Sequence, residues 1–166
     1  MTLAEAAAVA AQTSDERRLA ELRRDVDEEL EEAVRSPDFR QRALALRAIG
    51  QLRFVQKTEL LRRGLEDESP ACRGSALLSL ELLSRDHPRL VNKERPLLHE
   101  LANADPNAAV RRLAVLSLKH GSPSRDTLTL LQHLAEEDAE EGDLRAAAAS
   151  VHAVLKRKAG PAKPHR

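Results

Sequence analysis

Asp105–Gly121 reads DPNAAVRRLAVLSLKHG, and two earlier stretches of the chain follow the same pattern. Residues 69–83 read SPACRGSALLSLELL, and residues 36–50 read SPDFRQRALALRAIG. Each stretch opens with Ser or Asp followed by Pro, reaches an Arg within four to six residues, and continues with small and aliphatic residues. A sequence pattern that recurs three times at such spacing predicts a protein built from helical repeats.

The composition describes an ordinary soluble chain with balanced charge. Of its 166 residues, 42% are apolar and 33% are charged, and the formal net charge is zero. Proteins that bind nucleic acid usually carry net positive charge, and they often stack bases on aromatic side chains. This chain offers only Phe39 and Phe54 for stacking. The composition therefore disfavours nucleic acid as the main ligand.

Features tied to cellular location favour the cytoplasm. A single Cys suits a reducing compartment, and no apolar run approaches the length of a membrane span. The N-terminal stretch MTLAEAAAVAAQ lacks the basic region of a signal peptide. The excess of Arg over Lys and the abundance of Ala are typical of bacterial proteins from GC-rich genomes. We expect a cytoplasmic bacterial protein without membrane contact.

Helix signals run along nearly the whole chain. Gly and Pro fall between periodic segments, and no alternating strand pattern is present. Thr13 followed by Glu16 predicts a capping box, and each Ser-Pro or Asp-Pro pair predicts an N-cap with Pro at the first helical position. The first helices of four pairs are expected at about 14–35, 56–66, 93–103 and 123–138. The second helices are expected at about 37–53, 70–85, 106–120 and 143–157.

Equivalent arginines mark the start of each second helix. They lie 31, 38 and 34 residues apart, a spacing typical of helix-pair repeats, and they are Arg42, Arg73, Arg111 and Arg145. Each helix pair leaves an apolar face that it cannot bury alone, so neighbouring pairs are expected to stack on one another.

This pattern resembles the HEAT-repeat family, with DPNAAVRRLAVLSL as the closest match. The resemblance covers about residues 16–157 and implies an all-α fold, a short right-handed α-solenoid of about four HEAT-like helix pairs. In the fourth pair EEGDLR replaces the Asp-Pro turn and His152 replaces an aliphatic residue, which indicates a terminal capping repeat. The predicted organisation is a flexible or marginally helical N-terminus (1–13), the solenoid (14–157) and a basic disordered tail (158–166).

Catalytic and metal-binding patterns are not evident. No two of the six His are three to five residues apart, and zinc sites need clustered ligands. Cys72 lies in the first turn of a second helix, but Val110 and Leu144 occupy the equivalent place in other repeats, which favours a buried structural Cys. No Gly-rich phosphate loop or paired catalytic carboxylates stand out. We expect no enzyme activity, no metal and no cofactor.

The repeated arginines allow two interpretations. A column of guanidinium groups could bind a polyanion or an acidic peptide. The family resemblance implies a structural ladder instead, in which each Arg pairs with acidic groups of a neighbouring turn. The acidic residues near the turns are Glu66, Asp67, Asp105 and Asp143. We favour the ladder.

The second helices also carry leucines on the side opposite to their predicted core. If Ala76, Leu80 and Leu83 face the core, Leu78 and Leu82 point away from it. The resemblance implies that second helices line a concave surface, so an apolar strip with a polar rim is expected there. The alternatives are that this register is wrong or that another helix covers the leucines. The candidate partner-binding residues are Arg47, Gln51, Leu78, Leu82, Arg112, Leu116, Lys119 and His120.

These observations lead to one main functional hypothesis. The protein is expected to be a non-catalytic adaptor or scaffold whose concave second-helix face binds a helix or extended segment of another protein. The alternative is weak nucleic-acid binding through the repeat arginines and the basic tail. Tetrapyrrole chemistry, as in the phycobilin lyases, ranks last because no chromophore-handling residue is evident. Self-association through the leucine strip stays open, and so does the oligomeric state.

Overall fold

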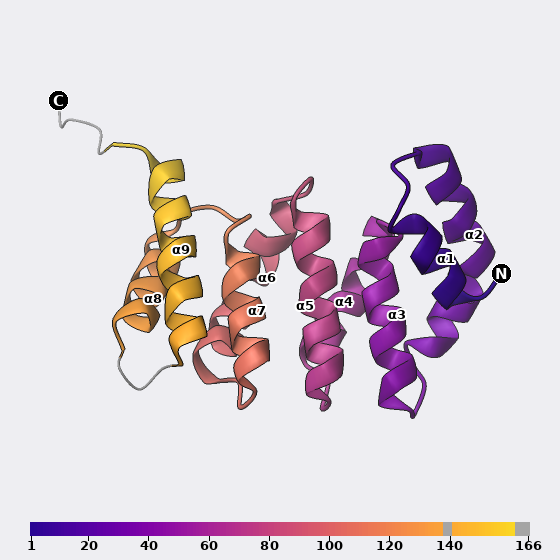
Figure 1. Cartoon of the computed structure of the whole chain (residues 1–166), viewed down its shortest axis with the longest axis horizontal. Helices are drawn as coiled ribbons and strands as arrows, with labels where there is room; N and C mark the ends of the chain where they lie inside the picture. Colours follow the sequence, from indigo (N-terminus) through magenta and orange to yellow (C-terminus); the bar gives the residue numbers. More distant parts are fainter. Residues whose placement is uncertain (138–140, 162–166) are drawn as a thin grey trace. The chain divides into compact units, whose positions relative to one another are not determined.

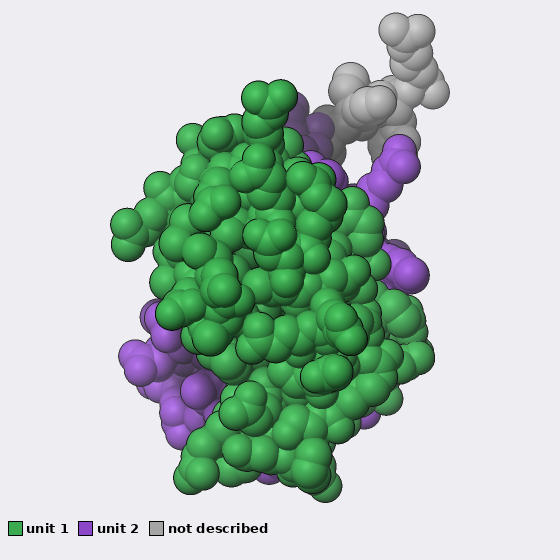
Figure 2. All heavy atoms as spheres, turned by 90° about the vertical axis from the view of Figure 1, so that its right-hand side faces the viewer, with its two compact units in different colours: residues 1–83 green, residues 84–166 purple. Residues whose placement is uncertain are grey.

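The computed structural model describes residues 1–137 and 141–161, and every regular element within these ranges is helical. The chain forms two compact units, residues 1–83 and residues 84–166 (Figure 2). The first unit holds α1 (Leu3–Ala10), α2 (Glu16–Ala33), α3 (Phe39–Gln51), the short 3₁₀ turn η1 (Val55–Lys57), α4 (Thr58–Leu65) and α5 (Pro70–Ser84), which ends at the boundary. The second unit holds α6 (Arg89–Ala104), α7 (Ala108–Leu118), α8 (Arg125–Glu136) and α9 (Gly142–Ala159) (Figure 1).

The predicted all-α fold of helix pairs is confirmed. The pairs are α2–α3, α4–α5, α6–α7 and α8–α9, and each lies within a few residues of its predicted bounds. On α2 the buried residues Leu19, Leu22, Val26 and Leu30 recur at steps of three and four, which places one apolar stripe against the rest of the first unit.

Three of the four helix caps predicted at Ser-Pro or Asp-Pro pairs lie two residues before the observed cap, whereas α5 begins at Pro70, directly after Ser69, as predicted. Asp38 caps α3, accepting a hydrogen bond from the Arg40 N–H (2.9 Å), while Ser36 Oγ accepts from the Asp38 N–H (3.1 Å). Asp105 Oδ1 likewise accepts from the Asn107 N–H (2.9 Å), and Asn107 caps α7. The predicted caps form a turn before the helix because their short polar side chains reach the N–H two residues on.

Residues 1–13, for which the sequence predicted a flexible or marginally helical segment, contain the capped helix α1. Thr2 Oγ1 accepts from the Glu5 N–H (3.2 Å), and Glu5 Oε2 accepts from the Thr2 N–H (2.8 Å). Leu3 and Ala6 are buried, and α1 contacts α2 and α3. A helix this short is marginal by itself, so burial against its neighbours is what stabilises it.

The predicted basic tail overlaps the last helix. α9 continues to Ala159, and Lys158 Nζ donates a hydrogen bond to the Lys119 carbonyl (2.6 Å). Residues 162–166 of the predicted tail lie outside the described residues.

α3 and α5 meet closely at a glycine. Ser79 Oγ accepts a hydrogen bond from the Gly50 N–H (3.0 Å) and donates one to the Leu46 carbonyl (2.5 Å). The serine therefore bridges an N–H and a C=O that are four residues apart on α3. A Cβ atom at Gly50 would lie 2.6 Å from Ser79 Cα, so only glycine allows this approach.

In the second unit a half-buried histidine connects α6 to the start of α8. His99 Nε2 lies 2.8 Å from Thr127 Oγ1, and Ser124 Oγ lies 2.8 Å from the same hydroxyl. Burial and the neighbouring charge of Arg95 lower the pKa of His99 below its ordinary value of 6.5, and Asp126 opposes them. The folded state therefore favours the neutral imidazole.

We expect this histidine to make the fold less stable at acidic pH. Because the pKa of His99 is lower in the folded than in the unfolded state, its contribution is complete above pH 6.5 and is lost as the pH falls through the folded value. The melting temperature, measured between pH 7.5 and pH 5, should fall less in His99→Gln than in the native protein. The exposed His87 is the control: His87→Gln should keep the native pH profile. A His99→Gln profile that matches the native one would contradict this prediction.

Candidate partner-binding surface

The exposed side of α3 and α5 carries large apolar side chains. Ala76, Leu80 and Leu83 of α5 are buried, as predicted, whereas Leu78 is 38% exposed. Leu44 of α3, which sequence reasoning missed, is 40% exposed. Because α3 packs its other sides on α1, α2 and α4, its exposed side faces away from the first-helix layer of the unit.

Polar residues continue this surface along the two helices. Leu44, Arg47 and Gln51 follow one another at helical steps of three and four, so they form one stripe on α3. Arg47 and Gln51 are half-buried, and so is Leu82, one turn after Leu78 on α5. We call the surface of Leu44, Arg47, Gln51, Leu78 and Leu82 the leucine face.

The remaining predicted residues belong to the second unit. Arg112 is exposed, and Leu116, Lys119 and His120 are half-buried, all on or just after α7. Leu116 lies between charged residues at helical spacing, so this α7 patch is more polar than the leucine face. The predicted site residues thus form two patches, one in each unit.

The arginines of the first unit are engaged in local contacts. Arg42 Nε lies 3.0 Å from Asp67 Oδ2, and Arg42 Nη2 lies 3.1 Å from Asp67 Oδ1. Arg42 Nη1 also donates to the carbonyl of Ser36, in the turn before its own helix (3.0 Å). Arg73 repeats this feature, donating to the carbonyls of Asp67 (2.9 Å) and Glu68 (3.2 Å). The predicted pairing with an acidic side chain is therefore observed for Arg42, and Arg73 shares with it the contacts to carbonyls of the preceding turn.

The ionisation of Asp67 reflects this pairing. Burial alone would raise the pKa of its carboxyl group, but hydrogen bonds from Arg42 and from the Ser69 N–H outweigh burial and hold the pKa below 3.8. The charged form is therefore the stable one in the fold. A guanidinium that is held by a bidentate carboxylate is poorly available to an external polyanion.

Cys72 is a structural residue, as the repeat register predicted. The side chain is fully buried, and Sγ donates a hydrogen bond to the Phe39 carbonyl (3.3 Å). Burial and the charge of Asp67 raise the pKa of the thiol, which disfavours the nucleophilic thiolate.

Among residues 1–137 and 141–161, no group of three or more His, Cys, Asp or Glu side chains is placed to hold a metal ion. None of the helices there combines the length and apolar character that a membrane crossing requires.

Comparison with known proteins identifies the repeats. A sequence profile described as HEAT repeats matches residues 26–119, from within α2 to the end of α7. The chain belongs to the HEAT repeat family. HEAT repeat proteins generally act as scaffolds for protein interactions, and the family is typically not enzymatic. A separate comparison with curated proteins found no match.

Proposed function

We propose that this HEAT repeat protein is a cytoplasmic, non-catalytic adaptor that binds a segment of another protein on its second helices. The observation that carries the proposal is the exposure of Leu44 and Leu78, at 40% and 38%, on the neighbouring helices α3 and α5. Exposed apolar side chains with a polar rim are typical of a protein-binding surface.

The chemistry of the leucine face favours an amphipathic partner. Leu44 and Leu78 supply the apolar contact, and Arg47, whose Nη1 is buried without a hydrogen-bond partner among the described residues, supplies a donor. A helix or extended segment with aliphatic residues on one side and carboxylates beside them would satisfy both groups. The α7 patch, with Arg112, Leu116, Lys119 and His120, offers a second and more basic contact of the same kind.

The test is a double charge substitution on the leucine face. Leu44→Asp/Leu78→Asp should abolish binding to the partner captured by the native protein, because two carboxylates would be desolvated against an apolar surface. The captured partner is then purified, and its affinity for both proteins is measured by calorimetry. A loss of at least about a hundredfold is expected.

Thr129→Asp/Gln132→Asp on the exposed side of α8 is the matched control, and it should bind as the native protein does. Circular dichroism verifies that both variants are folded. A folded leucine-face variant with native affinity would refute the proposal. A native dimer that the variant loses would make the surface a self-association interface. Salt-sensitive retention of DNA by the native protein would favour the nucleic-acid alternative.

A further inference from the structure

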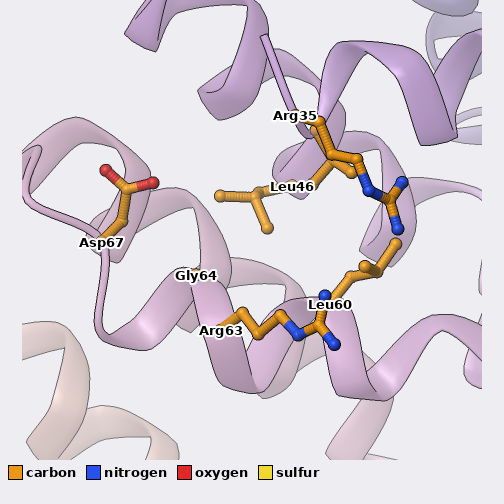
Figure 3. A pocket seen from close by; sticks show the side chains of 7 residues that line it. Arg35, Leu46, Leu60, Arg63, Gly64 and Asp67 are labelled. Carbon is orange, nitrogen blue, oxygen red and sulfur yellow. The ribbon is translucent and has the colours of Figure 1, made fainter. Parts of the chain in front are cut away.

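A small pocket opens beside α4 in the first unit, where the residues just after α2 and a leucine of α3 come together (Figure 3). It has a volume of about 90 Å³, and its apolar lining comes from Val34, Leu46, Leu60 and Gly64. Leu46 and Leu60 are themselves packed, with 1% and 8% of their surfaces exposed. The pocket therefore has a firm apolar wall, and its lining includes none of the residues of the leucine face.

Ion pairs lie beyond both ends of α4. Lys57 Nζ, just before α4, lies 2.7 Å from Asp27 Oδ1 and 2.6 Å from Glu31 Oε1 on α2. Beyond the other end of α4, Asp67 is held by Arg42. Between them stands Gly64, where a Cβ atom would lie 2.7 Å from Leu46 Cδ2. A side chain at Gly64 would therefore require Leu46 to shift, and such a shift would change the pocket wall that both residues line.

The charged side chains that line the pocket differ in whether another side chain neutralises them. Arg35, Arg63 and Asp67 are the charged residues that line the pocket (Figure 3). Asp67 accepts from Arg42, and Arg35 pairs with Glu31, so both are neutralised. Arg63 is exposed, and its side chain makes no hydrogen bond or ion pair with another residue in the described ranges. The charge left for a ligand is a single guanidinium.

These features specify the chemistry of an occupant. The wall favours an aliphatic group, and a space of about 90 Å³ suits a branched side chain better than an aromatic ring, since a cavity that holds benzene measures ~150 Å³. The free guanidinium of Arg63 favours a carboxylate next to that group. A cationic ligand is disfavoured because the nearby carboxylate of Asp67 already has its partner.

We propose that this pocket binds a short acidic segment of a partner protein, with an aliphatic side chain inserted against Leu46 and Leu60 and a neighbouring carboxylate on Arg63. This is a second interaction site, independent of the leucine face. Both sites can act on one partner or on two.

The test uses synthetic peptides and matched variants. A fluorescein-labelled EELEE peptide is titrated with the full chain, and fluorescence anisotropy reports binding. The native protein should bind EELEE at least about tenfold more tightly than EEAEE, because the leucine supplies the buried group. Arg63→Glu should weaken binding to EELEE about tenfold or more.

Arg62→Glu is the control for charge alone. It makes the same charge change one residue away, on a side chain that lies 3.7 Å from Glu59 and does not line the pocket. It should change the affinity less than about threefold. Equal losses in Arg62→Glu and Arg63→Glu, or equal affinities for EELEE and EEAEE, would show unspecific ionic attraction and overturn the proposal.

A second measurement locates the peptide. The methyl resonances of Val34, Leu46 and Leu60 should shift when EELEE is added, while those of Leu131, in the core of the second unit, should not. Val34→Phe should fill the pocket and abolish peptide binding, with circular dichroism showing that the fold is kept. Leu44→Asp/Leu78→Asp should bind the peptide as the native protein does. Unmoved pocket methyls, or native peptide affinity in a folded Val34→Phe variant, would refute the site.

Discussion

Gly50→Val should destabilise the protein by about 3 kcal/mol, because any Cβ at this position would lie 2.6 Å from Ser79 Cα and 2.7 Å from Ser79 Oγ. The overlap is with backbone as well as side chain, so rotation of the serine cannot relieve it. α3 and α5 would have to separate, and the hydrogen bonds that Ser79 makes with Gly50 and Leu46 would lengthen. Urea unfolding followed by circular dichroism measures the loss.

Gly142→Val is the control for β-branching near a helix terminus. The nearest atom to a Cβ at Gly142 is 4.0 Å away, so this substitution should change the free energy of unfolding by less than about 1 kcal/mol. Replacing Ser79 by Gly in the Gly50→Val background should recover part of the loss, since it removes the side-chain half of the overlap. Equal stabilities of Gly50→Val and Gly142→Val would contradict the close-contact argument.

Asp67→Ala should cost about 2 kcal/mol of stability, because it removes the carboxylate that Arg42 and the Ser69 N–H both contact. The guanidinium of Arg42, whose side chain is only 13% exposed, would lose its bidentate partner and keep only the longer contact of Nη2 with Glu68 Oε1, at 3.8 Å. Thermal or urea unfolding measures the effect. Asp25→Ala, an exposed acidic residue on α2, should change stability by less than about 0.5 kcal/mol.

The same pair should produce a distinct dependence on acid. The folded state holds the pKa of Asp67 below its ordinary value of 3.8, so the stabilisation is complete above pH 3.8 and is lost as the pH falls through the folded value. The native protein should therefore lose more stability than Asp67→Ala between about pH 4 and pH 2. Parallel profiles for the two proteins would show that the ion pair does not set the pKa.

The repeat pattern was sufficient to predict the fold class and the helix pairs. Leu19, Leu22, Val26 and Leu30 define a helix face by spacing alone, and the Arg42 position set the repeat register. The N-cap residues were less predictable. Ser36 and Asp38 can both cap a helix, and only the backbone conformation of the folded chain shows that Asp38 does so. The sequence predicted only a flexible or marginally helical segment at α1, because local propensity does not include burial against distant residues.

The candidate surfaces were predictable only in part. Leu78 followed from the helical period, because its neighbours Ala76 and Leu80 define the buried side. Leu44 was missed although it precedes Arg47 by one turn on the same stripe, a signal that the α3 sequence does contain. No sequence pattern predicted the pocket, because it depends on how the end of α2, α3 and α4 pack together. Arg63 could not be singled out from the sequence, because only the structure shows which of the many arginines line the pocket.

The bridge between Ser79 and Gly50 limits how this array could be lengthened or reordered by protein engineering. Ser117 occupies the same repeat position as Ser79, yet its hydroxyl bonds back to Leu113 within its own helix (2.9 Å). The serine alone is thus compatible with different neighbours. A duplicated copy of α5, however, can be seated as it is here only behind a helix that has glycine at the position of Gly50. Repeats that look interchangeable in sequence therefore cannot be exchanged freely, because the absence of a side chain at Gly50 fixes which helix can precede α5.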